Sequence, residues 1–437
     1  MLGVGFGVAV AVGNAIGAGI FRAPGEVAGH LSSQTLVLIA WTAGGLYALL
    51  GAIQIAELAT MLPRSGGQYV FSRHALGEYA GFVVGWSDWI STCGSTAAVT
   101  IVTAEFTAAL VPSLSGRVPA VAAAVAVAFA LVQWRGVRES SVVQNVTSAM
   151  KGLAFAALIV GAFTRDAAAR PDTAVIVTAP STGIAVAFLL ALQSVVYTYD
   201  GWTGVVYFSE EVRNPARDIP RSLFAGVASI IAIYLLVNLA ILHVLPMSTL
   251  AGDPFAAGTV VNALLGDGGA VTLRILTIVS MLSAVNAFHL MASRVLLAMS
   301  RDGLVSRRLA VVNRGGTPVA ALLLSTVVAI VFIVFGRTFE RVITVLAFFF
   351  IANYTLSFTS LVVMRVREPE RPRPYRAWGY PWTTGIALAG SVAFLIGAIF
   401  ADTTNSVTAV LVLVASYPLF RWLRARRREE RATIPAS

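Results

Sequence analysis

Two short glycine-rich segments interrupt long apolar runs and place backbone groups where they can bind a charged ligand. The first covers residues 13–21 (GNAIGAGIF), and the second covers residues 197–204 (YTYDGWTG). Glycine tolerates non-helical backbone and allows a ligand to approach the chain closely. Backbone that leaves the helix at membrane depth must be buried in protein or line a cavity, because lipid cannot satisfy its N–H and C=O groups. These segments therefore predict a binding site inside the membrane.

The two interruptions predict opposite chemistry. A helix that restarts after the first break, with free amides around Ile16 to Gly19, presents the positive end of its dipole and suits a carboxylate. A helix that ends near Tyr197 and Thr198 exposes free carbonyls, which suit an ammonium group. Amides on one side and carbonyls on the other are suited to a zwitterion, that is, an α-amino acid. The residues that we expect to bind the substrate are Asn14, Ala15, Ile16, Gly17, Ala18, Gly19, Tyr197, Thr198, Tyr199 and Asp200.

The composition indicates the elements that must position these segments. Of 437 residues, 57% are hydrophobic and 12% are charged, and the mean hydropathy is +0.80, whereas soluble proteins carry roughly 25% charged residues. A membrane span needs about 20 apolar residues, and this rule predicts an all-α integral membrane protein with about twelve spans. The predicted spans are 3–28, 35–62, 79–111, 118–134, 144–163, 182–209, 220–244, 270–299, 318–335, 340–364, 384–401 and 404–423.

Arginines set the predicted orientation. The net charge is +10, and Lys151 is the only lysine in the sequence. The arginines gather in alternate loops, which the positive-inside rule places in the cytoplasm. Both chain ends are therefore predicted to lie on the inner side of a plasma membrane, and a nucleic acid partner is not expected. The composition, rich in Ala, Val and Arg, suggests a bacterial source.

The two interruptions lie five spans apart. Interrupted helices at matching positions of two halves are typical of inverted-repeat transporters with a site near the midplane. We expect residues 1–165 (spans 1–5) to form one repeat and residues 181–365 (spans 6–10) the other. Residues 380–423 then add spans 11 and 12, and residues 424–437 form a basic cytoplasmic tail. A helical stretch is expected at Ala256–Leu265, either as a part of the gate or as an ordinary surface loop.

Several motifs carry a family resemblance. Residues 13–21 resemble a span-1 signature, and residues 63–69 (PRSGGQY), 199–202 (YDGW) and 209–215 (SEEVRNP) resemble later motifs. On these motifs the chain resembles the amino acid–polyamine–organocation superfamily, and within it the L-amino acid transporter-like permeases. The resemblance implies a leucine-transporter-type fold with five-plus-five inverted repeats and alternating access. It also implies that Tyr197 closes over the bound substrate as a gate, and that Ala18 replaces a hydroxyl donor common at its position.

Two charged residues inside predicted spans each have two interpretations. Asp200 either contacts the substrate or supports the unwound backbone, since a carboxylate at membrane depth is functional by default. Lys151 of span 5 either extends back to the membrane surface or, by the resemblance, places its ammonium where related transporters bind sodium. In the second case it bridges the first break to Ser280 or Ser283 of span 8. Lys151 is also a candidate for carrying a coupling proton.

These observations predict a secondary active transporter of L-amino acids that works without sodium, as an exchanger or a proton-coupled symporter. The alternative is a polyamine or cationic amino acid carrier, for which Asp200 is the only hint. A membrane enzyme is disfavoured because the sequence has no nucleophile–base pair or phosphate-binding loop, and Cys93 is its only cysteine. We expect no metal, no cofactor and no obligatory protein partner. The expected partners are the amino acid, lipid and, for a symporter, protons.

Overall fold

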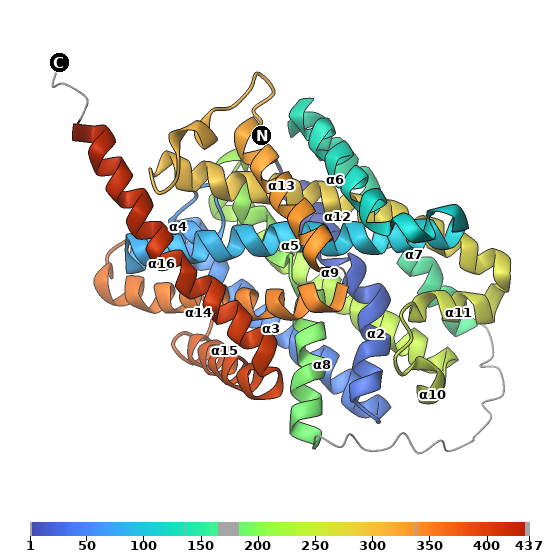
Figure 1. The fold of residues 1–437 in the computed structure, drawn as a ribbon. Helices are drawn as coiled ribbons and strands as arrows, with labels where there is room; N and C mark the ends of the chain where they lie inside the picture. Colours follow the sequence, from blue (N-terminus) through green and yellow to red (C-terminus); the bar gives the residue numbers. More distant parts are fainter. Residues whose placement is uncertain (1, 136, 165–182, 337–338, 433–437) are drawn as a thin grey trace.

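The computed structural model describes residues 2–135, 137–164, 183–336 and 339–432, and these are almost entirely helical (Figure 1). The α-helices are α1 (Val4–Ala15), α2 (Ala18–His30), α3 (Gln34–Met61), α4 (Gln68–Leu76), α5 (Glu78–Leu110), α6 (Val118–Arg135), α7 (Val137–Thr164), α8 (Ile184–Tyr199), α9 (Pro215–Val244), α10 (Met247–Leu250), α11 (Ala256–Leu265), α12 (Asp267–Arg301), α13 (Val319–Gly336), α14 (Phe339–Arg367), α15 (Trp382–Ala401) and α16 (Thr403–Ala432). The 3₁₀ helices are η1 (Pro112–Arg117), η2 (Trp202–Glu211) and η3 (Arg307–Ala310).

The predicted all-α membrane architecture is confirmed. In the described ranges, ten helices are long and apolar enough to cross a membrane, and the bent pair of α1 and α2 gives an eleventh candidate. The apolar part of α13, Val319–Phe335, is shorter. Each predicted span coincides with one helix or with one interrupted pair, while twelve crossings remain a prediction.

Two long helices form the centre of the molecule. α5 has 33 residues and α12 has 35, and they pack along each other and against α13 (Figure 1). The apolar part of α12 is 94% buried, whereas the corresponding parts of α15 and α16 are only 28% and 22% buried. α15 and α16 therefore form part of the periphery, where their apolar side chains face lipid.

The two interrupted helices lie antiparallel to each other. α1 packs against η2, and α2 packs against α8. Because α1 precedes α2 while α8 precedes η2, this pairing brings the two breaks together in the interior. The arrangement fits the expected inverted repeat, which remains a prediction.

The connection after α9 contains the helix that the sequence predicts at Ala256–Leu265, now α11. Its beginning is fixed to α2, because the Gly252 N–H donates to the Gly25 carbonyl at 2.8 Å. A Cβ atom at Gly25 would lie 2.1 Å from the carbonyl oxygen of Asp253, so the glycine permits this close approach. The connection is thus packed on the second half of the interrupted helix, and its part in gating remains a prediction.

Candidate functional site

The first interruption is a tight turn centred on Ile16. Its φ of −77° and ψ of 74° are those of an inverse γ-turn. The Gly17 N–H donates to the carbonyl two residues earlier at 2.8 Å, and the Ile16 N–H donates to the carbonyl four residues earlier at 2.9 Å. These two amides, which we expected to be free, are therefore used within the turn. The amides that remain available are those of the first turn of α2, on Ala18, Gly19 and Ile20, because the first N–H groups of a helix have no carbonyl partner within that helix.

The second interruption is made by Asp200 and Gly201. Asp200 is extended, with φ −60° and ψ 152°, and Gly201 has a φ of 107°, which favours glycine. A Cβ atom at Gly201 would also lie 2.6 Å from the Cβ of Asn14. Conformation and space both require glycine here, and the chain continues as the 3₁₀ helix η2.

Tyr234 of α9 joins the two interruptions. Its hydroxyl lies 2.5 Å from the carbonyl oxygen of Ala15 and 2.8 Å from that of Thr198. The hydroxyl has one proton and therefore donates to one of these carbonyls at a time. Sequence reasoning missed Tyr234, because a tyrosine in an apolar span has the pattern of an ordinary packing residue.

Gly17 and Gly19 have different roles. A Cβ atom at Gly19 would lie 2.7 Å from Oγ1 and 3.0 Å from Cα of Thr198. Gly19 thus allows α2 to lie directly on α8. A Cβ atom at Gly17 would meet nothing closer than 3.5 Å, which is an ordinary contact.

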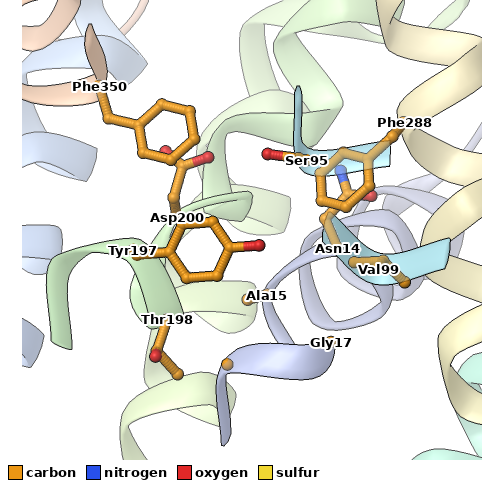
Figure 2. Close-up of a pocket in the computed structure, with 11 residues that line it drawn as sticks. Asn14, Ala15, Gly17, Ser95, Val99, Tyr197, Thr198, Asp200, Phe288 and Phe350 are labelled. Carbon is orange, nitrogen blue, oxygen red and sulfur yellow. The ribbon is translucent and has the colours of Figure 1, made fainter. Parts of the chain in front are cut away.

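A small cavity lies where the two interruptions meet (Figure 2). It contains about 290 Å³ of space that atoms do not fill. Seven of the ten residues that we expected to bind substrate line it, namely Asn14, Ala15, Gly17, Gly19, Tyr197, Thr198 and Asp200. The Oδ1 atom of Asn14 is buried and has no hydrogen-bond partner in the described part of the chain. It therefore leaves one acceptor next to the cavity for a ligand.

The other three predicted residues are not among those that line the cavity. Ile16 is fully buried and contributes its carbonyl to a different contact, described below. Tyr199 packs against the rings of Trp41 and Tyr234, at centroid distances of 6.0 and 5.0 Å. The side chain of Ala18 lies outside the described residues.

Four residues from other helices complete the cavity, and sequence reasoning missed them. They are Ser95 and Val99 of α5, Phe288 of α12 and Phe350 of α14. The only sequence signal is the spacing of Ser95 and Val99, since residues four apart share a helix face. The rings of Tyr197 and Phe350 stack with centroids 6.3 Å apart, so they cover one side of the cavity together.

Asp200 has a visible structural role. Its Oδ1 accepts a hydrogen bond from the Tyr354 hydroxyl at 2.6 Å, and Trp202 stacks on the Tyr354 ring at 5.4 Å. These contacts anchor the second interruption to α14, as expected if Asp200 supports the unwound backbone. Because Asp200 also lines the cavity, contact with a substrate remains a proposal.

Lys151 of α7 reaches the first interruption. Its Nζ donates to the carbonyl of Gly13 at 2.8 Å and to that of Ile16 at 2.9 Å. The side chain is 2% exposed, so the ammonium points into the protein and not back to the membrane surface. A Cβ atom at Gly13 would lie 2.0 Å from the Gln144 amide nitrogen, which shows how closely α7 approaches α1.

Ser280 and Ser283 of α12 are both buried, but neither forms the expected hydrogen bond with Lys151. Their hydroxyl oxygens have no partner among the described residues. Ser280 and Lys151 nevertheless line one small cavity, with Phe21 and Phe155. The structure thus brings Ser280 near the lysine, whereas a role for Ser283 beside it remains a prediction.

Asp88 of α5 is a second acid at membrane depth, and sequence reasoning overlooked it. It is 4% exposed, and the Tyr207 hydroxyl lies 2.7 and 2.9 Å from its two carboxyl oxygens. This contact joins α5 to η2. Asp88 has no partner at helical spacing in span 3, so only the fold reveals the tyrosine.

Ion pairs close the end of the molecule that we expect to face the cytoplasm. The carboxylate of Asp302, at the end of α12, forms ion pairs with Arg64 at 3.1 Å and with Arg73 at 3.0 Å. Arg301 pairs with Glu210 of η2 at 3.1 Å. These pairs connect the end of α12 with the segment before α4, with α4 itself and with η2.

A further acid, Glu57 of α3, is fully buried and holds two arginines. Arg365 lies 2.6 Å and Arg373 lies 3.2 Å from its oxygens, and the Ala377 N–H donates to it at 2.6 Å. Glu57 therefore fastens α3 to α14 and to the segment before α15. In the described ranges, no three His, Cys, Asp or Glu side chains gather as a metal site.

The fold and the site define a polytopic α-helical membrane transporter, with a buried cavity between two interrupted helices. The family model for amino acid permeases matches residues 7–420, and the chain belongs to this family. The match covers the interruptions, the cavity and all helices from α2 to α15.

Curated relatives cover most of the chain. The serine/threonine exchanger SteT of Bacillus subtilis (strain 168) is 26% identical, over 98% of this chain and 97% of the relative. The b(0,+)-type amino acid transporter 1 of Mus musculus is 29% identical, over 85% and 77%. The Asc-type amino acid transporter 1 of Mus musculus is 28% identical, over 84% and 71%. Relatives of this kind are transporters, which supports the expectation that the chain is not an enzyme.

Proposed function

We propose that this protein is a secondary active transporter that moves L-amino acids across the plasma membrane by alternating access. The observation that carries the proposal is the cavity between the two interruptions. The first-turn amides of α2 and the orphan acceptor Asn14 Oδ1 lie at the first interruption, and the last carbonyls of α8 lie at the second. The family and its relatives support amino acids as the substrate class. Both termini in the cytoplasm and two five-span repeats belong to the same proposal.

The substrate carboxylate binds the first-turn amides of α2, on Ala18, Gly19 and Ile20. Three amides at a helix N-terminus, with the positive end of the dipole, suit an anion. The substrate ammonium binds at the end of α8. The carbonyls of Tyr197 and Thr198, which we expected to be free, already accept from the Asp200 N–H and the Tyr234 hydroxyl, but each keeps a second lone pair for the ammonium. Asn14 Oδ1 offers it a further acceptor, since that atom has no partner in the described residues.

The cavity favours a small neutral side chain. The rings of Tyr197 and Phe350 border the cavity, and the Ser95 hydroxyl and Val99 suit a short polar or apolar group. Asp200 is already engaged by the Tyr354 hydroxyl at 2.6 Å, which weighs against a cationic substrate or a polyamine. The name of the serine/threonine exchanger supports small neutral amino acids and exchange.

Closure on both sides of the cavity supports alternating access. Tyr197 and Phe350 stack across one side of it, and Tyr197 is the proposed gate. Arg22 of α2 pairs with Glu105 of α5 towards one membrane face, while Asp302 and its arginines close the other. A carrier must break one set of contacts at a time to expose the site to one face.

Sodium independence rests on Lys151. Its ammonium donates to the carbonyls of Gly13 and Ile16, and backbone carbonyls are also the ligands that transporters of this architecture use for a coupling cation. A fixed ammonium at these oxygens removes the need for sodium. Replacement of Na⁺ by choline at fixed pH is expected to leave uptake unchanged, and abolition of uptake would contradict this part of the proposal.

The test of function is uptake by purified protein in liposomes preloaded with serine. Radiolabelled serine and threonine should exchange at higher rates than leucine, and arginine and putrescine should not exchange. Empty liposomes should take up far less label if exchange is obligatory, whereas a pH gradient should drive that uptake if protons are coupled. Accumulation of putrescine or arginine in place of serine would overturn the proposed substrate class.

A further inference from the structure

A basic hollow lies away from the substrate cavity, between the segment that follows α12 and the end of α16. It opens to the outside. Its walls include the side chains of Leu304, Arg307, Arg308, Trp422, Leu423 and Arg426. Three of these six residues are arginines, which come from two elements more than a hundred residues apart in sequence.

The charged residues that line this hollow in the described part of the chain are all arginines. Arg307, Arg308 and Arg426 form no ion pair in the part of the chain that the structure describes. The neighbouring Arg424 differs, since it lies 3.9 Å from Glu78. Three like charges around one space repel each other, and an anion between them relieves that repulsion. Guanidinium groups match the geometry of phosphate in particular.

The position of Trp422 places the hollow at the level of lipid headgroups. The apolar span of α16 runs from Thr403 to Arg426, so Trp422 stands near its end, and its side chain is 49% exposed. Tryptophan gathers at membrane interfaces, because its ring is apolar and its N–H is polar. The Arg426 guanidinium lies 4.3 Å from the Trp422 ring centroid. This charge therefore lies at the headgroup level together with the Trp422 ring.

An apolar stripe continues from the hollow into the membrane. Leu411 and Val414 of α16 are 61% and 60% exposed, and Leu411 lies eleven residues before Trp422, on the same helix face. A ligand with its phosphate among the arginines can therefore lay an acyl chain along this face. A free phosphate would leave the stripe unused.

We propose that this hollow binds the phosphate headgroup of an anionic phospholipid, with one acyl chain along the outer face of α16. The Gly303–Arg308 segment of the hollow directly follows Asp302, which holds Arg64 and Arg73. The Ser300 hydroxyl also donates to the Ser306 carbonyl at 2.7 Å. The segment that would hold the headgroup is therefore continuous with the residue whose ion pairs close this end of the transporter.

The test uses the full-length protein in nanodiscs of phosphatidylcholine with an increasing fraction of phosphatidylglycerol. Native mass spectrometry measures how strongly the protein retains each lipid. Each basic residue near an anionic surface contributes a factor of about five in affinity. The Arg307→Gln/Arg308→Gln/Arg426→Gln variant should therefore lose about a hundredfold of its preference for phosphatidylglycerol.

A matched control removes three other arginines. Arg213, Arg217 and Arg221 are exposed and lie outside the hollow, just before α9 and in its first two turns. Their triple Gln variant carries the same change of charge. It should lose much less of the preference for phosphatidylglycerol than the hollow variant, because its arginines do not surround one space. Equal losses in both triple variants, or retention by the hollow variant, would overturn the proposal.

Two further measurements distinguish lipid from soluble anions and test whether the variant folds. In the first, inorganic phosphate or glycerol phosphate is added to the wild type, and the rise in melting temperature is compared with that caused by phosphatidylglycerol. An equal rise would show that the hollow is a site for soluble anions and would overturn the lipid assignment. The variant's melting temperature in pure phosphatidylcholine reports its folding. If the triple variant does not fold, Arg426→Gln alone should reduce the lipid preference about fivefold, and an unchanged preference would contradict the proposal.

Discussion

The Nζ atom of Lys151 lies 2.8 Å from the carbonyl oxygen of Gly13, which joins α7 to the turn that interrupts the first helix. The same ammonium donates to Ile16 at 2.9 Å. Both oxygens belong to the interruption, where the helix ladder cannot use them. A residue on a neighbouring helix thus stabilises the non-helical backbone that shapes the substrate cavity.

Lys151→Met should abolish or strongly reduce exchange, because it leaves two buried carbonyls without a charged donor. Each unsatisfied group costs about 1–3 kcal/mol, so we expect the turn to lose its geometry. The smaller Lys151→Ala variant leaves room beside the same oxygens. Its melting temperature should rise in NaCl relative to choline chloride, while that of the wild type should not. Wild-type exchange by Lys151→Met would refute the role given to this ammonium.

Tyr234→Phe should weaken the joint between the two interruptions. The variant keeps the ring but removes the hydroxyl that lies 2.8 Å from the Thr198 carbonyl oxygen. Leaving that carbonyl short of a donor costs about 1–3 kcal/mol, and we expect exchange to fall about tenfold or more. The control is Tyr47→Phe, which removes a hydroxyl contact with Ser391 at 2.8 Å; neither residue is among those that line the cavity. Equal effects of both variants on exchange would indicate a general loss of stability.

The sequence allows some parts of this site to be predicted and not others, for physical reasons. Glycine clusters and a lone lysine stand out in apolar spans, so the pattern of residue types alone reveals both interruptions and Lys151. That pattern does not reveal which amides are free and which are hydrogen-bonded, because the γ-turn at Ile16 depends on how the two helix halves meet. Tyr234 and Asp88 have no pattern of their own, since their partners lie on other helices. Tertiary proximity, which spacing along the chain does not encode, decides these contacts.

Gly17→Ala and Gly19→Ala should have different effects. A Cβ atom at Gly19 would lie 2.7 Å from Thr198 Oγ1, and such overpacking costs about 1–3 kcal/mol, so Gly19→Ala should unfold at a lower temperature. At Gly17 the nearest atom would be 3.5 Å away, so Gly17→Ala should fold normally but reduce the space for substrate. Thermal unfolding with and without serine separates the two. Normal stability of Gly19→Ala, with normal serine binding, would contradict the close packing described here.

Glu368, outside the spans, should give a small pH dependence of stability. The hydrogen bond from Arg371, followed by that from His74, holds the pKa of Glu368 below its ordinary value. A lowered carboxyl pKa stabilises the folded state above the unfolded pKa, near 4.5, and this contribution disappears as pH falls through the folded pKa. The melting temperatures of the wild type and Glu368→Gln should therefore converge below about pH 4. A difference that grows as the pH falls would have the wrong sign.

Glu57→Gln should be far more damaging than Glu368→Gln, although both remove one negative charge. Glu57 is fully buried, with Arg365 at 2.6 Å and Arg373 at 3.2 Å, and Arg373 is only 5% exposed. Removing one partner of a buried ion pair leaves an uncompensated charge and typically costs about 3–5 kcal/mol. Glu368, whose side chain is 34% exposed, contributes about 0–1 kcal/mol. Thermal unfolding of both variants in one detergent measures the contrast, and similar melting temperatures would mean that Glu57 does not fasten α3 to α14.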